Sequence, residues 1–244
     1  NSNVKKLSKN IKTRKIITYS KNKNSDIKIV STNNDKGVII SKFTLFFKKG
    51  IIKNINGKYN FKLSLLGDHN ILNATAAIIA SLLCGVPMNK ISNSLSTFQG
   101  VKRRFSFLGK ISKSSIYDDY AHHPSEIEAS YQIAKQISRK KIIVIFQPHR
   151  YSRTNLLLND FIKVLKKIDI LYVLDIYDAG EKPIKNINSK NLVNKIKNKN
   201  KNVFYLNKKA KIKKTLEPYF NDNNTIVFMG AGSITYLAQS LFTK

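Results

Sequence analysis

The pattern of apolar and polar positions changes near residue 104. Before that point the chain contains short runs rich in β-branched and aromatic residues, separated by turns of Asn, Gly and Lys. Runs of this kind predict β-strands. The strands are expected at Lys15–Tyr19, Asp26–Ser31, Gly37–Phe47 and Tyr59–Leu66. The first part of the chain is therefore expected to begin as a β-rich meander.

Two helices are expected after this meander. The segment Asn70–Cys84 is rich in alanine, has apolar residues at helical spacing and stops at Gly85. Pro87 starts a shorter helix that ends near Phe98. Because Cys84 lies on the apolar face of the first helix, we expect it to be buried in the core.

From Arg104 onward, strand patterns and helix patterns alternate. Strands are expected at Arg104–Ile111, Ser114–Asp118, Lys141–Gln147, Asp169–Tyr177, Asn202–Leu206 and Thr225–Met229. Helices are expected at Pro124–Ser138, Thr154–Lys167, Asn188–Asn198, Lys208–Phe220 and Ser233–Phe242. This alternation predicts an α/β fold with a mostly parallel, doubly wound sheet. We place a domain boundary at the basic connector, which gives domains 1–103 and 104–244.

Polar residues gather in the loops that follow four of these strands. The loops are Asp119–Pro124, Pro148–Arg153, Tyr177–Glu181 and Gly230–Gly232. A parallel sheet brings the carboxyl ends of its strands to one edge, where ligands bind in such folds. Three of the four histidines and two of the six arginines are therefore expected on one rim. They are His122, His123, His149, Arg150 and Arg153.

The charged residues of these loops also have structural interpretations. Asp118 and Asp119 could serve only as helix caps. Arg150 and Arg153 could form a solvated helix face. The pair His122–His123 could bind a metal, but vicinal histidines rarely face one site together and further ligands are missing. We therefore expect no metal ligand in this chain.

The two glycine-containing loops can also be interpreted as turns without a ligand. Gly230–Gly232 resembles a dinucleotide fingerprint, but Thr235 stands where the third glycine would be, which favours a tight turn. The segment Tyr177–Glu181 is equally consistent with a simple turn. Neither loop indicates a ligand when it is taken alone.

The net charge of +30 admits two explanations. A nucleic-acid partner would use dispersed phosphate contacts. Lysine-rich coding bias is favoured instead, because lysines are spread along the whole chain and interleaved with asparagine, as in Asn194–Lys199. No specific nucleic-acid partner is therefore expected. Four of the six arginines form two tight clusters, and arginine binds carboxylate and phosphate with a planar fork that lysine lacks.

Several cellular contexts are disfavoured. The longest apolar runs, such as Ile142–Phe146, are far shorter than the ~20 residues of a membrane helix. The start of the sequence has no apolar segment typical of a secretory signal. One cysteine excludes an internal disulfide framework. We therefore expect a soluble protein of the reducing cytoplasm, with no membrane partner.

Three motifs occur in order along the chain. They are Gly67-Asp68-His69-Asn70-Ile71-Leu72-Asn73-Ala74, then Phe98-Gln99-Gly100 with Arg103-Arg104-Phe105, then Asp118-Asp119-Tyr120-Ala121-His122-His123-Pro124. As a set they resemble the Mur ligases, the ATP-dependent amino-acid ligases of peptidoglycan precursor synthesis. The segments Phe146–Thr154 and Ala179–Glu181 are similar to those of the members that join L-alanine to UDP-N-acetylmuramate. The resemblance covers about Leu66 to the C-terminus.

The family has an N-terminal UDP-binding domain, a central ATPase domain and a C-terminal Rossmann-like domain. The resemblance implies that residues 1–103 are the end of the central domain and that 104–244 are the C-terminal domain. The sequence contains no G-x-x-x-x-G-K-[ST] phosphate loop. The phosphate loop and the Mg²⁺ ligands are therefore expected upstream, and this chain is expected to be a fragment that is inactive alone.

The resemblance also implies an ATP-binding set. Asn70 and Asn73 are expected to contact the adenine, since an amide pairs with both donors and acceptors of a base edge. Arg104 is expected to reach the ATP phosphates across the domain cleft, and Asp119 the ribose hydroxyls.

On the acceptor side, the resemblance implies that His122, Arg150 and Arg153 are catalytic and bind the amino acid and the acyl phosphate. His149 is a further substrate-binding candidate there. Two other functions stay open. The murein-peptide recycling ligase shares the Ala-His-His-Pro motif, although Gln-Pro-His-Arg is not expected in it. A basic nucleic-acid-binding module is the alternative that is not an enzyme.

Overall fold

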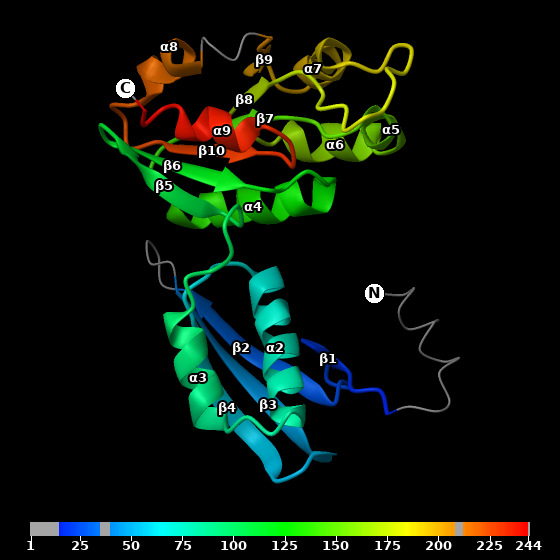
Figure 1. Cartoon of the computed structure of the whole chain (residues 1–244), viewed down its shortest axis with the longest axis vertical. Coiled ribbons are helices and arrows are strands. Elements are labelled where there is room, and N and C mark those ends of the chain that lie inside the picture. Colours follow the sequence, from blue (N-terminus) through cyan, green and yellow to red (C-terminus); the bar gives the residue numbers. More distant parts are fainter. Residues whose placement is uncertain (1–14, 35–39, 208–211, 244) are drawn as a thin grey trace. The chain divides into compact units, whose positions relative to one another are not determined.

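The computed structural model describes residues 15–34, 40–207 and 212–243. Contacts between Cα atoms divide the chain into two units, one up to Gln99 and one from Gly100 (Figure 1). The start of the strand expected from Gly37 and the first residues of the helix expected from Lys208 lie outside the described residues.

The unit up to Gln99 packs two helices on one face of a four-stranded sheet. Its strands, in sheet order, are β1 (Tyr19–Ser20), β2 (Ile27–Asn34), β3 (Ser41–Ile52) and β4 (Ile55–Leu63). β1 pairs parallel with β2, and the other pairs are antiparallel. The helices are α2 (Asp68–Leu83) and α3 (Met88–Thr97).

The core of this unit follows from the alternation of side chains along β3. Phe43, Leu45 and Phe47 are buried, while the residues between them are more exposed. Ile71 and Ile78 of α2 belong to the same buried cluster. The amphipathic pattern therefore produces a sheet covered by helices on one face.

The unit from Gly100 is built around a six-stranded sheet with the order β5-β6-β10-β7-β8-β9. The strands are β5 (Ser106–Ile111), β6 (Ser114–Asp119), β7 (Ile142–Phe146), β8 (Ile170–Val173), β9 (Val203–Tyr205) and β10 (Thr225–Met229). β5 is antiparallel to β6, and every other neighbouring pair is parallel. The predicted α/β fold with a mostly parallel sheet is confirmed.

Helices cover both faces of this sheet. They are α4 (Pro124–Ile137), α5 (Tyr151–Leu156), α6 (Leu158–Leu165), α7 (Ser189–Lys197), α8 (Ile212–Leu216) and α9 (Ile234–Gln239), with a 3₁₀ turn at Glu217–Tyr219. One core cluster joins the sheet to α4, α6 and α7, and a second joins it to α8 and α9. Figure 1 shows α4 and α9 on opposite sides of the sheet. Successive residues of a strand pack into opposite clusters: Val144 belongs to the first and Ile145 to the second.

Several predicted elements differ from the structure. The helix expected at Thr154–Lys167 begins earlier and is divided at Leu157, whose φ of −107° and ψ of 20° interrupt the helical geometry. The strand expected to reach Tyr177 ends at Val173. Cys84 is exposed rather than buried, because it follows the last residue of α2 and lies off the stripe formed by residues such as Ile71 and Ile78.

Candidate active site

The carboxyl edge of the parallel sheet brings together side chains from three loops. The rings of His122, which follows β6, and His149, which follows β7, lie 5.6 Å apart between centroids. Tyr177, which follows β8, stacks on His149 at 5.5 Å and 17°. Arg153 of α5 reaches His149 with its guanidinium. The convergence that the topology predicted is therefore present for these residues.

Only one histidine of the vicinal pair faces this cluster. His122 Nδ1 lies 2.9 Å from the carbonyl oxygen of Tyr120. His123 is exposed, and its Nδ1 accepts from the backbone N–H of Ser125 as the cap of α4. Glu126 completes the capping box from the third helical position. The two rings therefore do not face one site together, and no group of three or more His, Cys, Asp and Glu suited to a metal ion occurs among the described residues.

The hydrogen bonds of the two facing histidines fix opposite tautomers. A carbonyl oxygen only accepts, so Nδ1 of His122 carries the proton and Nε2 of the neutral ring is an acceptor. Arg153 Nη1 lies 3.3 Å from Nδ1 of His149, and arginine only donates, so the neutral His149 carries its proton on Nε2. Burial lowers the pKa of His149, and the nearby Arg153, His122 and Arg150 lower it further.

Arg150 stands at the start of α5 with its backbone in the left-handed region, at φ 72°. Its side chain is about 50% exposed, and its Nη1 lies 3.9 Å from Oε1 of Glu181. Arg153 is partly buried against His149 instead of standing on a solvated face. The two arginines therefore share a helix start but have different surroundings.

Asp118 and Asp119 point to opposite faces of the sheet, because they are neighbours on β6. Both are almost fully buried, at 2% and 4% exposure. Asp118 accepts from Thr235 Oγ1 at 3.0 Å. Asp119 accepts from the N–H of Ala121 at 2.9 Å and from Ser130 Oγ at 2.5 Å. Neither caps α4, so the interpretation of these residues as helix caps is wrong.

Burial raises the pKa of both carboxyl groups, and the hydrogen bonds just described counteract it. Arg103 lowers the pKa of Asp118, while Arg104 lowers that of Asp119. The pKa of each acid is therefore lowered by a different arginine of the same pair.

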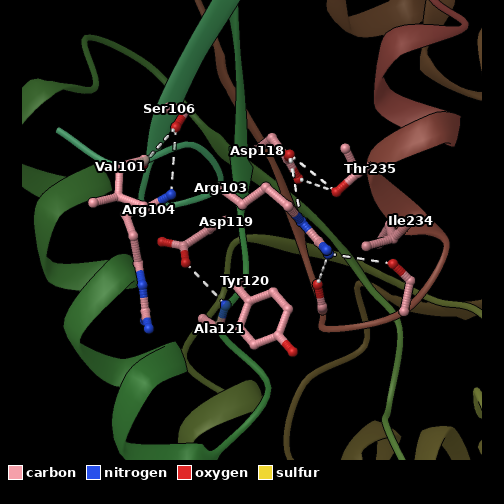
Figure 2. A network of polar contacts seen from close by, with 12 residues as sticks. Val101, Arg103, Arg104, Ser106, Asp118, Asp119, Tyr120, Ala121, Ile234 and Thr235 are labelled. Carbon is pink, nitrogen blue, oxygen red and sulfur yellow. Dashed lines mark hydrogen bonds and ion pairs between the residues drawn. The ribbon is translucent and has the colours of Figure 1, made fainter. Parts of the chain in front are cut away.

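Arg103 lies at the same edge of the sheet, and the sequence alone assigned it no role of its own. Its Nη2 donates to the carbonyl oxygens of Gly230 at 2.7 Å and Gly232 at 3.2 Å. Its guanidinium lies 4.7 Å from the ring centroid of Tyr120, and its Nε is 3.9 Å from Asp118 (Figure 2). The clustering of arginines in a lysine-rich chain was the signal that could have identified it.

The loop Gly230–Gly232 bends sharply between β10 and α9 and lies close to its neighbours. Gly230 has φ 156°. A Cβ at Gly232 would meet Tyr177 Cγ at 2.6 Å and Gln147 Oε1 at 2.7 Å. Gln147 Oε1 in turn accepts from the N–H of Ile234 at 3.1 Å. The glycines thus permit close approach of three loops.

The four residues expected to bind ATP are divided between the two units. Asn70 Nδ2 donates to the carbonyl oxygen of Leu66 at 2.8 Å, and Asn73 is exposed one turn further along α2. Arg104 is exposed, and its guanidinium lies 5.9 Å from the ring centroid of Tyr120, which Arg103 also approaches. Asn70 and Asn73 belong to one unit, whereas Arg104 and Asp119 belong to the other.

A family model described as Mur ligase, glutamate ligase domain, matches residues 103–232. The chain belongs to the Mur ligase family. The match includes every residue of the carboxyl-edge cluster and the Arg103 network as far as Gly232. It does not include Asn70 and Asn73. The described residues include no helix long and apolar enough to cross a membrane.

Individual Mur ligases are similar to the whole chain. The UDP-N-acetylmuramate–L-alanine ligase of Wigglesworthia glossinidia brevipalpis is 38% identical over 242 residues, which are 95% of this chain and 50% of the relative. The solved UDP-N-acetylmuramate–alanine ligase of Thermotoga maritima has 27% identity and a TM-score of 0.74, covering 93% of this chain and 47% of that one.

A second solved structure shares the fold. It is the MurF ligase of Thermotoga maritima in complex with ADP, with 17% identity and a TM-score of 0.70, covering 98% of this chain and 51% of that one. The chain spans about half the length of the Mur ligases that it matches.

Proposed function

We propose that this chain is the carboxyl-terminal half of an enzyme that joins L-alanine to UDP-N-acetylmuramate at the expense of ATP. Membership of the Mur ligase family and the names of its similar relatives support this proposal. The single observation that carries it is the convergence of His122, His149, Arg150 and Arg153 on one edge of the sheet.

The chemistry of amide formation suits this cluster. A carboxylate is a poor acyl donor, so ATP converts it to an acyl phosphate, which the amine of L-alanine then attacks. The acyl phosphate and the alanine carboxylate are both anionic, and Arg150 and Arg153 supply planar donors for them. His149 is neutral and offers an Nε2–H donor to the same oxygens.

His122 has a different proposed role. The attacking amine must lose its proton, and His122 is held with Nε2 as the acceptor because Nδ1 is bound to the Tyr120 carbonyl. His122 adjoins His149, which Arg153 contacts, so an acceptor nitrogen and anion-binding donors lie at the same edge of the sheet. We assign proton acceptance to Nε2 of His122.

The ATP-binding roles stay as proposed from the sequence: Asn70 and Asn73 at the adenine, Arg104 at the phosphates and Asp119 at the ribose. ATP supplies the phosphoryl group that activates the carboxylate, with Mg²⁺ held by residues upstream of this chain. Each oxygen of Asp119 already accepts one hydrogen bond. A carboxylate oxygen has a second lone pair, which is the acceptor that the proposed ribose hydroxyls would use.

The test uses the complete protein encoded by the gene that contains this chain. Phosphate release from ATP and UDP-N-acetylmuramate is measured with and without L-alanine. Alanine-dependent release that Arg150→Ala abolishes supports the proposal, with exposed Arg139→Ala as the matched control. We also expect the 244 residues alone to show no alanine-dependent ATP hydrolysis.

The same assay separates the alternatives. Release with a murein tripeptide but with no single amino acid would identify a recycling ligase instead. Absence of phosphate release with both acceptors would contradict the ligase proposal. The net charge of +30 would then make salt-dependent binding to duplex and single-stranded nucleic acid the next measurement.

A further inference from the structure

The segment Tyr177–Glu181, which the sequence left open as a simple turn, is fastened to the loop that carries Arg150. The N–H of Arg150 donates to the carbonyl oxygen of Tyr177 at 2.8 Å, and the N–H of Tyr177 donates to that of Pro148 at 2.8 Å. His149 and Tyr177 thereby form an isolated parallel bridge. We call Tyr177–Glu181 the clasp.

Glu181 fastens the far end of the clasp. Its Oε2 accepts from the backbone N–H of Ser152 at 3.0 Å, and its Oε1 accepts from Ser152 Oγ at 2.6 Å. Both carboxylate oxygens are therefore bound by one residue, two positions after Arg150. The clasp holds the chain on both sides of Arg150, through Tyr177 before it and Glu181 after it.

Arg150 needs this support because its φ of 72° is in the left-handed region, which is unfavourable for a residue with a side chain. Such a conformation persists only where surrounding contacts determine it. Thr154 Oγ1 adds one contact by donating to the carbonyl oxygen of Arg150 at 2.8 Å. The direction in which the Arg150 side chain leaves the backbone therefore depends on contacts that include the clasp.

The distances also show how Glu181 divides its interactions. Its Oε1 is 3.9 Å from Arg150 Nη1, which is longer than a hydrogen bond. The carboxylate thus makes its hydrogen bonds with Ser152 and with the backbone of Tyr151, and the half-exposed guanidinium of Arg150 keeps its donors for an anion. At this distance the negative charge of Glu181 still attracts the Arg150 guanidinium.

We propose that Glu181 is a positioning residue: through Ser152 it holds the Arg150 guanidinium in place for the carboxylate of the incoming amino acid. This inference rests on the proposed function of Arg150. It assigns to the Ala179-Gly180-Glu181 motif a role in amino-acid affinity without contact with the substrate.

The experiment compares variants of the complete protein in the phosphate-release assay. Glu181→Gln replaces one acceptor oxygen by a donor and is expected to raise KM for L-alanine about ten-fold, the order of losing a hydrogen bond to a charged group. Ser152→Ala keeps the backbone donor, so a smaller rise is expected. Glu181→Asp keeps the charge and both acceptors, and recovers part of the affinity. KM for ATP should stay unchanged in all three.

Glu128→Gln is the matched control. It removes the same charge from a carboxylate that pairs with Lys167 at 2.7 Å, on α4 away from the clasp. Its KM for L-alanine should equal that of the wild type. An equal rise in Glu128→Gln and Glu181→Gln would overturn the inference, since a general charge effect would then account for both.

Amide hydrogen exchange in residues 150–156 keeps the inference separate from the proposed function. Faster exchange of the Ser152 amide in Glu181→Gln supports the clasp even if the assay shows no ligase activity, which would contradict only the proposed function. If Arg150→Lys raises KM for L-alanine while Glu181→Gln changes neither KM nor exchange, the inference is wrong and the proposed function stands.

Discussion

Arg103 Nη2 donates to the carbonyl oxygen of Gly230 at 2.7 Å, which links the chain before β5 to the loop after β10. The same guanidinium lies over Tyr120 and beside the buried Asp118 (Figure 2). One arginine therefore holds three segments of the carboxyl edge together. Its planar fork is suited to this, because the donors leave in fixed directions.

The first prediction concerns this link. Arg103→Lys keeps the charge but loses the fork, so we expect the unfolding free energy to fall by about 2 kcal/mol, the order of an unsatisfied buried group plus lost hydrogen bonds. Urea denaturation measures it. The neighbouring exposed Arg104→Lys should change stability by no more than ~0.5 kcal/mol. Equal losses in the two variants would contradict the role of Arg103.

The second prediction concerns the crowding at Gly232. A methyl group there would lie 2.6 Å from Tyr177 Cγ and 2.7 Å from Gln147 Oε1, so Gly232→Ala should destabilise the protein by about 1–3 kcal/mol. Thermal denaturation measures the loss. Adding Tyr177→Ala removes one of the two obstacles, and the double variant should therefore lose less than the sum of the single variants. Simple additivity would show that the clash with Tyr177 is not the cause.

The sequence predicted the sheet and its functional edge because long-range geometry follows from strand and helix alternation. His122, His149 and Arg153 meet as the parallel topology requires. The contacts of Arg103 were not predictable, since they depend on a left-handed backbone at φ 63° that no local pattern specifies.

Element ends were harder to predict than element types. Leu157 belongs to a continuous helical pattern, yet its local geometry divides α5 from α6. Cys84 was assigned to the apolar face of α2, but it follows the last helical residue and lies off the buried stripe, so it is exposed. In both cases apolar periodicity identified the helix, while the backbone at its end decided the position of the residue.

The third prediction concerns Asp119, whose pKa burial raises above the ordinary value of 3.8. The folded state then binds a proton more readily than the unfolded state, so this carboxyl costs stability as pH rises from 3.8 through the raised pKa. Relative to the wild type, Asp119→Asn should therefore gain stability as pH rises from 4 to 7. Urea midpoints at several pH values test this, with exposed Asp222→Asn as the control for charge. A constant difference across that range would contradict the prediction.

The fourth prediction concerns His149, whose pKa burial and the neighbouring Arg153 lower from the ordinary value of 6.5. Below pH 6.5 the unfolded chain takes up a proton that folded His149 resists, so the wild type should lose stability as pH falls to 5.5. His149→Gln keeps an acceptor for Arg153 but does not titrate, and its stability should fall less over the same range. Urea midpoints at pH 7.5 and 5.5 provide the comparison.

Because protonation of Nδ1 also removes the acceptor that Arg153 uses at 3.3 Å, the wild type should show a larger rise in KM for L-alanine at pH 5.5 than His149→Gln does. Equal changes in the wild type and in His149→Gln would mean that another group controls stability and KM for L-alanine at low pH.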